Sequence, residues 1–182
     1  MKRGLTITAV AAVLLAVMAS AGAAPSGVVP ITGASTELSF TGTLTVTGFD
    51  VLHKQPSLEG TLNGPLSSSN AGVEADLSDL PVHIVLDGVA PTCQPPQVTI
   101  TTQVTSVPIP GFGDLTLESL TLLRPVDPAD TALVDQICQA ADDLGNQPGK
   151  LRGKRLAEAV DALNALGGTW QLAPSQAPTT GR

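Results

Sequence analysis

Short runs of alternating apolar and polar residues are the feature that most limits what this chain can fold into. Between positions 38 and 47 the large apolar residues occupy even positions, and threonines occupy most odd ones. Such period-two alternation, built from threonine, valine and leucine, is typical of a half-buried β-strand. After Gly48 the apolar positions move to Phe49 and Val51, which predicts a β-bulge near Gly48.

The same alternation recurs along the chain, with turn signals between the segments. It is found at residues 58–62, 73–77, 82–86, 98–104 and 115–122. A second one-residue shift near Ser119 predicts another bulge. Because no helical pattern separates these segments, we expect an antiparallel meander. Residues 24–36, rich in proline, glycine, serine and threonine, are predicted to be an irregular lead-in, and residues 87–96 a crossing loop.

The period changes after residue 126. Asp127 followed by Pro128 is typical of a helix N-cap and first helical position. Apolar residues then follow at helical spacing up to Gly145, and a second helix is predicted after Pro148-Gly149, ending at Gly167-Gly168. The apolar stripe of this second helix consists of Leu156, Ala159, Val160 and Leu163. Residues 171–182 are predicted to be a disordered tail.

Together these patterns predict one α+β domain over residues 37–170. We expect an antiparallel meander sheet of five to seven strands, curved by the two bulges. Two C-terminal α-helices are expected to pack on one face of that sheet.

The first 23 residues have the composition of a secretory signal peptide. Lys2 and Arg3 precede an apolar run over residues 7–18, and small residues follow. That run is too short to span a bilayer, and cleavage is expected after Ala23, with Ala21 or Ala24 as alternatives. We therefore expect a secreted or extracytoplasmic protein, in the periplasm or cell envelope, with no transmembrane span in the mature chain.

Charge and aromatic content argue against several classes of partner. The formal net charge is −7, and the 182 residues include three phenylalanines, one tryptophan and no tyrosine. Nucleic acids and anionic membranes attract basic proteins, and base stacking needs aromatic faces. We expect no nucleic-acid partner.

Two cysteines, Cys93 and Cys138, are predicted to form one structural disulfide, because an even pair in an exported domain is most simply a bridge. Free thiols or metal ligands are the alternatives. Two cysteines and two distant histidines do not match the spacing of a zinc site.

No motif for catalysis or cofactor binding is present. Residues 145–151 lack the spacing of a phosphate-binding loop, no G-x-S-x-G elbow occurs, and His53 and His83 are isolated. We expect no enzyme activity, cofactor or metal. Calcium remains an alternative at two acidic clusters, which consist of Glu74, Asp76 and Asp79, and of Asp127, Asp130 and Asp135.

One basic cluster near the start of the second helix is a possible patch for an anionic partner such as acidic lipid headgroups. It consists of Lys150, Arg152, Lys154 and Arg155. The alternative is a solvated helix start.

The order of several segments resembles an uncharacterised family of small exported bacterial proteins. The segments are GTLTVTGF at 42–49, GTL at 60–62, Thr92-Cys93, the leucine-rich residues 115–122 and Ile137-Cys138. The resemblance implies a threonine- and glycine-rich hairpin and a helix bearing the second cysteine. It implies no known activity and no functional residues.

We therefore expect a noncatalytic exported module that binds a partner or contributes structure at the cell envelope. The alternative is a carrier that holds a small apolar ligand between the sheet and the helices. A third possibility is a hydrolase whose site forms only in three dimensions.

Overall fold

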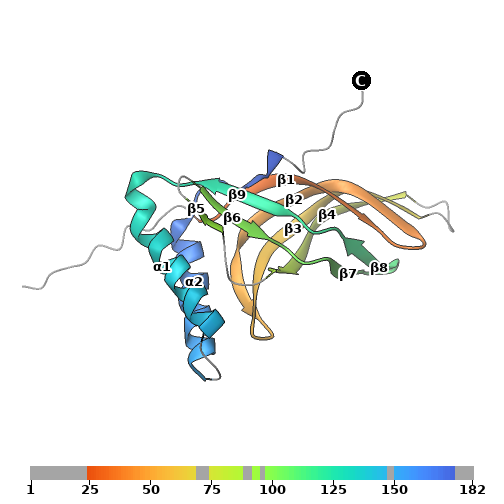
Figure 1. Ribbon diagram of the computed structural model, residues 1–182. Coiled ribbons are helices and arrows are strands. Elements are labelled where there is room, and N and C mark those ends of the chain that lie inside the picture. Colours follow the sequence, from red (N-terminus) through yellow and green to blue (C-terminus); the bar gives the residue numbers. More distant parts are fainter. Residues whose placement is uncertain (1–23, 69–73, 88–91, 95–96, 147–149, 175–182) are drawn as a thin grey trace, which may run out of the picture.

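The computed structural model describes residues 24–68, 74–87, 92–94, 97–146 and 150–174 (Figure 1). The predicted leader, residues 1–23, lies outside these residues. Antiparallel strands make up most of the described chain, and two helices lie side by side at one end of the molecule. The predicted α+β class is confirmed.

The described strands form two sheets. The first sheet has six strands in the order β4-β3-β2-β1-β8-β7, and the second has four in the order β10-β9-β6-β5. The strands of the first sheet are β1 (Gly27–Ala34), β2 (Leu38–Leu52), β3 (Gln55–Ser68), β4 (Glu74–Val85), β7 (Thr105–Ile109) and β8 (Gly113–Leu117). Those of the second are β5 (Thr92–Gln94), β6 (Gln97–Thr101), β9 (Thr121–Pro125) and β10 (Gln171–Leu172).

The prediction of a single meander is wrong, because β1 pairs with β8 and four further strands form a second sheet. The six-stranded sheet also curls until its two edges meet at one end. There Gln103 N–H, just before β7, donates to the Val85 carbonyl of β4 at 2.7 Å. Beside it, Asp87 N–H donates to the carbonyl of Thr101 in β6 of the second sheet at 2.7 Å. The first sheet is therefore nearly a barrel, and the other four strands form a separate sheet beside it (Figure 1).

The shift of the apolar pattern near Ser119 is not a bulge. Residues 118–120 carry the chain from β8 in the first sheet to β9 in the second. Leu117 and Leu120 are both buried. The shift from odd to even apolar positions therefore keeps leucines in the core both before and after the chain passes from one sheet to the other. A period-two pattern reports which face is buried and does not report which sheet a strand joins.

The predicted irregular lead-in is a regular strand, β1, which pairs with β2 along its whole length. Val29 and Ile31 face the core, and Val28, Pro30 and Thr32, which alternate with them, are exposed. Pro30 is tolerated because its missing N–H would point to the strand edge that β2 does not occupy, and proline is compatible with such an edge. Composition indicated a loop, whereas pairing with a long partner strand imposed the extended conformation.

The hairpin of β2 and β3 has the predicted bulge, between Val46 and Gly48. Its two-residue turn consists of His53 and Lys54, with φ values of +50° and +65°. The strands predicted on either side of Pro81 are one strand, β4, which accepts proline because it is an edge strand. The crossing loop predicted over residues 87–96 also contains a strand, β5.

A short 3-10 helix, η1 (Pro128–Asp130), leads into α1 (Thr131–Asn146), and α2 (Lys150–Leu166) follows. Asp127 occupies the predicted N-cap position, although its side chain makes no capping hydrogen bond. The predicted stripe of α2 is buried, and the helix ends before Gly167 and Gly168, whose φ values of +53° and +72° suit glycine.

We predicted that both helices pack on one face of the sheet, and this is wrong. Helix α2 contacts β2 and β3, whereas α1 packs mainly on α2 and also touches β5. The tail is also partly ordered, because Gln171 and Leu172 pair with β9. Residues 175–182 lie outside the described chain.

Leucine, valine and isoleucine from both sheets and both helices form the core, together with Phe40, Phe49 and Trp170. The rings of Phe49 and Trp170 meet edge to face, with centroids 5.3 Å apart. Trp170 has no exposed surface, and its indole N–H is the one buried side-chain polar group of the described residues that lacks a partner.

Candidate functional site

The predicted disulfide is supported at one of its two ends. Cys138 is half-buried on α1 and is disulfide-bonded, and no described cysteine is a free thiol. The side chain of Cys93 lies outside the described residues, so the pairing of Cys93 with Cys138 stays a prediction. The backbone of β5, which includes Cys93, contacts α1, as that pairing requires.

Two members of the predicted basic patch are described with their side chains, and both pair with one acid. Lys154 Nζ lies 3.6 Å from Glu158 Oε1, and Arg155 donates to Glu158 Oε2 at 2.8 Å. The hydrogen bond from Arg155 lowers the pKa of the Glu158 carboxyl, and the charges of Arg155 and Lys154 act in the same direction. The side chains of Lys150 and Arg152 lie outside the described residues, so the patch as a whole stays a prediction.

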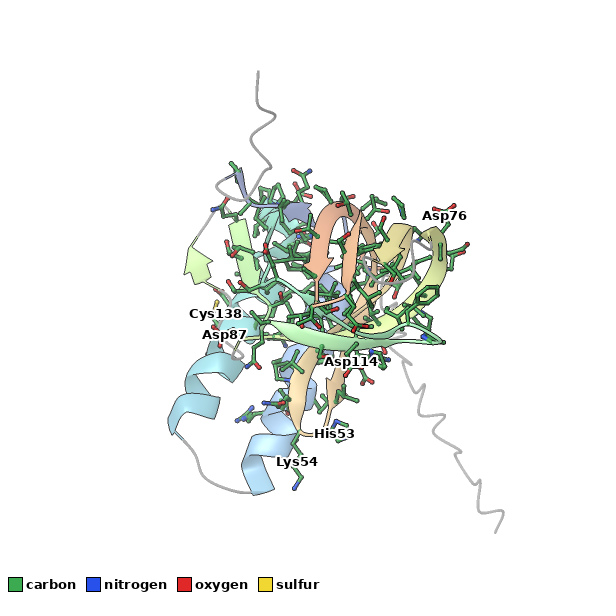
Figure 2. All side chains as sticks on the ribbon, turned by 90° about the vertical axis from the view of Figure 1, so that its right-hand side faces the viewer. His53, Lys54, Asp76, Asp87, Asp114 and Cys138 are labelled. Atoms are coloured by element: carbon green, nitrogen blue, oxygen red, sulfur yellow. The ribbon has the colours of Figure 1, made fainter. Side chains whose placement is uncertain are left out.

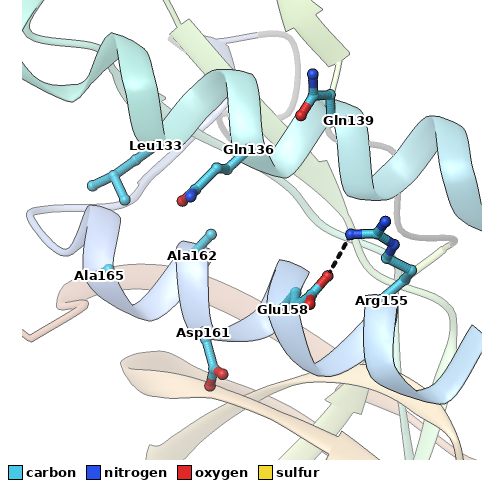
Figure 3. A pocket seen from close by; sticks show the side chains of 8 residues that line it. All are labelled: Leu133, Gln136, Gln139, Arg155, Glu158, Asp161, Ala162 and Ala165. Carbon is cyan, nitrogen blue, oxygen red and sulfur yellow. Dashed lines mark hydrogen bonds and ion pairs between the residues drawn. The ribbon is translucent and has the colours of Figure 1, made fainter. Parts of the chain in front are cut away.

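A groove of about 470 Å³ runs between α1 and α2 and includes this ion pair (Figure 3). Its wall on α1 is formed by Leu133, Gln136 and Gln139, and that on α2 by Arg155, Glu158, Asp161, Ala162 and Ala165. Glu158 and Asp161 outnumber the one cation in the groove, and that cation is already paired with Glu158. The described lining therefore does not attract an anion.

The predicted chemical residues are not brought together. His53 lies at the hairpin tip, and the exposed His83 on β4 lies 3.7 Å from the Glu59 carboxylate. Figure 2 shows His53 and Asp76, which belongs to the first acidic cluster, in separate parts of the molecule. Asp130, a member of the second acidic cluster considered for calcium, forms an ion pair with Arg124, with Arg124 Nη2 2.8 Å from Asp130 Oδ2. Among the described side chains, no three acids, histidines or cysteines are grouped to hold a metal ion.

A second groove, of about 340 Å³, lies where the two sheets diverge. Ile31, Leu120 and Leu172 form its apolar lining, together with Pro30. Thr32, Thr41, Gly42, Glu118 and Ser119 complete it. The sequence patterns did not indicate this groove, because most of its residues come from a predicted loop, a predicted bulge and a predicted tail.

One side of this groove is a strand edge that has no neighbour among the described strands. The edge is closed at one end, where Ser26 N–H donates to the Gly168 carbonyl at 2.9 Å and Trp170 N–H donates to the Ser26 carbonyl at 2.7 Å. It is closed at the other end by β8, which pairs with β1 only at Gly33 and Ala34. From Gly27 to Thr32, no described strand pairs with this edge of β1. We call this stretch the open edge.

The backbone groups that face the open edge follow from strand alternation. Ser26 and Ala34 both bond away from β2, whereas Ser35 N–H bonds back to Leu38, so even-numbered residues face outward from β2. Val28 therefore presents its N–H and its carbonyl at the open edge, and Pro30 presents a carbonyl alone. Both are exposed, and Val28, at 65%, is one of two large apolar residues exposed in the described chain.

The space between sheet and helices, where the alternative hypothesis placed an apolar ligand, holds protein side chains. Phe49, Leu163 and Trp170 are buried there, and Asn164 hydrogen-bonds to Phe49. The apolar groove of the described residues lies instead beside the open edge.

Neither α1 nor α2, within the described part of the chain, combines the length and apolar character needed to cross a membrane. No model of a protein family, no curated protein and no solved structure matches this chain. The resemblance to a family of exported proteins therefore stays a prediction.

Proposed function

We propose that this protein is a noncatalytic binding module that holds an extended segment of a partner protein in the groove beside β1. One observation carries the proposal: an unpaired strand edge, from Gly27 to Thr32, runs beside an apolar groove of about 340 Å³. Unpaired strand edges and adjacent apolar pockets are the two elements by which proteins bind extended peptides.

The shape of the groove favours a linear segment over a folded partner. β1 and β2 form one wall, and residues 118–120 with Leu172 form the other. Other segments of the chain also pair with residues at both ends of the open edge and so limit its length. The edge strand of a folded domain carries its own neighbours and would collide with the far wall, whereas an isolated extended segment has none.

The apolar lining favours a segment that brings one apolar side chain to the groove. Ile31 and Leu120 are buried at its base, and Leu172 is half-buried. A small apolar molecule in the same groove is the second candidate, since a volume of this size suits a small ligand.

Selection from a phage-displayed library of random linear peptides tests the proposal. The full-length protein is compared with Ser119→Trp, which fills the groove from an exposed position, and with Ser78→Trp, an exposed site on β4 that β3 and β2 separate from β1. We expect peptides that bind the parent and Ser78→Trp and lose at least tenfold in affinity for Ser119→Trp.

Two results contradict the proposal. Either the parent enriches no linear peptide more strongly than Ser119→Trp does, or the enriched peptides bind all three proteins with equal affinity. Native mass spectrometry of the protein from its producing cell tests the second candidate, which predicts a bound small molecule that Ser119→Trp lacks.

We further propose that the protein works outside the cytosol, as the composition of residues 1–23 supports. The N-terminus of the protein recovered from the producing cell's envelope or culture fluid is expected at residue 22, 24 or 25. An intact N-terminus at Met1 in the cytosol contradicts this part of the proposal.

A further inference from the structure

We infer that the partner segment binds as an added β-strand along the open edge of β1 and places a lysine or arginine beside Glu118. This inference rests on the proposed function and specifies how the partner is recognised. It assigns the affinity to main-chain hydrogen bonds and the preference among sequences to one apolar and one basic side chain.

The open edge offers more backbone acceptors than donors. Val28 offers one donor and one acceptor, and Pro30 offers one acceptor. Thr32 also faces outward, but the register of β1 with β8 places it opposite Glu118 of the chain itself. A bound strand must therefore present two N–H groups two residues apart, toward Val28 and Pro30. Its carbonyl opposite Pro30 receives no hydrogen bond. The stretch from Gly27 to Thr32 is about 20 Å long at roughly 3.3 Å per residue, which suits a segment of about six residues.

Pro30 also weakens unwanted pairing with a long exposed strand. Proline on an edge removes a hydrogen bond that any added strand would gain, and natural sheets use it to limit aggregation. A segment that pairs with the remaining groups and also fills the groove with a side chain therefore binds more tightly than one that pairs alone.

Charge selects the side chain at the β8 end of the groove. Glu118 is exposed on the rim, and it forms no ion pair with a described residue. The chain as a whole carries a formal charge of −7, which favours a basic partner segment. A lysine or arginine beside Glu118 would gain both the local and the overall attraction.

N-methylation of the best peptide from the selection tests strand addition. Each amide is methylated in turn, because a methyl group removes the donor without changing the side chain. We expect Kd to rise about 3- to 10-fold at two positions that are two residues apart, as one lost hydrogen bond allows, and less than twofold at the position between them. Hydrogen exchange at the Val28 amide should slow when the unmodified peptide is bound.

Removal of the rim charge tests the basic residue. With Glu118→Gln, we expect the preference for lysine over glutamine in the peptide to fall about two- to fivefold, and the difference from the parent to vanish in 1 M salt, where the Debye length is about 3 Å. Asp114→Asn removes an equal charge from the neighbouring strand β8, outside the groove lining, and should leave the preference unchanged.

The outcomes separate this inference from the proposed function. If Ser119→Trp abolishes peptide binding while N-methylation acts equally at all positions, the groove binds peptides but strand addition is wrong. If the lysine preference is the same in Glu118→Gln, the assignment of the basic residue is wrong. If no linear peptide binds, the proposed function fails and this inference fails with it.

Discussion

The side-chain amide of Asn164 on α2 hydrogen-bonds to both backbone groups of Phe49 on β2. Phe49 N–H donates to Asn164 Oδ1 at 2.9 Å, and Asn164 Nδ2 donates to the Phe49 carbonyl at 2.8 Å. Strand β1 stops pairing with β2 at Gly27, opposite Val46. Beyond the bulge, the amide of Asn164 therefore takes the place of a neighbouring strand and attaches the helix layer to the six-stranded sheet.

Replacing Asn164 with alanine is expected to lower the free energy of unfolding by about 1–3 kcal/mol, since two part-buried hydrogen bonds are lost at about 0.5–1.5 kcal/mol each. Urea denaturation followed by tryptophan fluorescence measures the change. Asp161→Ala, an exposed position on the same helix, is the control and should change stability by less than about 0.5 kcal/mol. Equal stability of the two variants would show that the amide does not attach α2 to β2.

Gly42 on β2 is expected not to tolerate a side chain. A Cβ there would lie 2.5 Å from Phe40 Cζ and would collide with the Asn63 carbonyl oxygen. Gly42→Ala should lower stability by about 1–3 kcal/mol because the core must shift. Gly153→Ala is the matched control, because α2 leaves open space at that position and alanine favours a helix. That substitution should raise the melting temperature, and a rise for both would contradict the packing at Gly42.

The two-residue turn of the β2–β3 hairpin holds His53 and Lys54 in left-handed conformations that cost non-glycine residues about 1–2 kcal/mol each. Substituting the pair with Asn-Gly should raise stability by about 1 kcal/mol, since these residues favour such a turn. Thermal unfolding measures the gain. Substitution with Ala-Ala is the control and should give no gain, because alanine meets the same steric cost. A gain with Ala-Ala equal to that with Asn-Gly would argue against the turn.

Arg124 and Asp130 form a part-buried ion pair that joins β9 to η1. Their side chains are 9% and 21% exposed, and their atoms are 2.8 Å apart. Asp130→Ala should lower stability by about 2–3 kcal/mol, because it leaves a buried guanidinium without its partner. The double variant Arg124→Met with Asp130→Ala should regain more than half of that loss. Asp135→Ala, exposed on α1, is the control in the same denaturation experiment. If the double variant is less stable than Asp130→Ala, the pair itself is not the cause.

Glu158 is expected to titrate below the ordinary range for a glutamate, since the hydrogen bond from Arg155 lowers its pKa. A lowered folded-state pKa means that the pair stabilises the fold above the unfolded-state pKa, and that this contribution is lost as pH falls through the folded-state pKa. Arg155→Gln should therefore raise the Glu158 pKa toward its usual value. Lys154→Gln should raise it less, because its contribution is smaller. Carboxyl NMR titration measures both, and an unchanged pKa in Arg155→Gln would contradict the assignment.

Local patterns predicted the elements that depend on neighbours in sequence. The alternation at residues 38–51 placed β2 and its bulge, because a side chain every second residue must face the core. The stripe from Leu156 to Leu163 placed α2, and paired glycines placed its end. The α+β class followed from the order of these two periods.

Pairing partners could not be read from the same patterns. Residues 27–34 have the composition of a loop and become a strand only because β2 extends far enough to pair with them. Leu172 becomes part of a sheet only because β9 presents an edge to it. These contacts join residues far apart in the chain, and a period-two pattern carries no information about them.

By itself, then, the sequence determined the element type and the buried face of its strongly periodic segments, because burial of a side chain there follows the local repeat. Only the tertiary structure decided that two sheets diverge at residues 118–120 and leave β1 with an open edge beside a groove. Ile31, Leu120 and Leu172 are brought together by strand pairing between distant segments, and the physical cause of that pairing is the requirement that backbone N–H and carbonyl groups find partners.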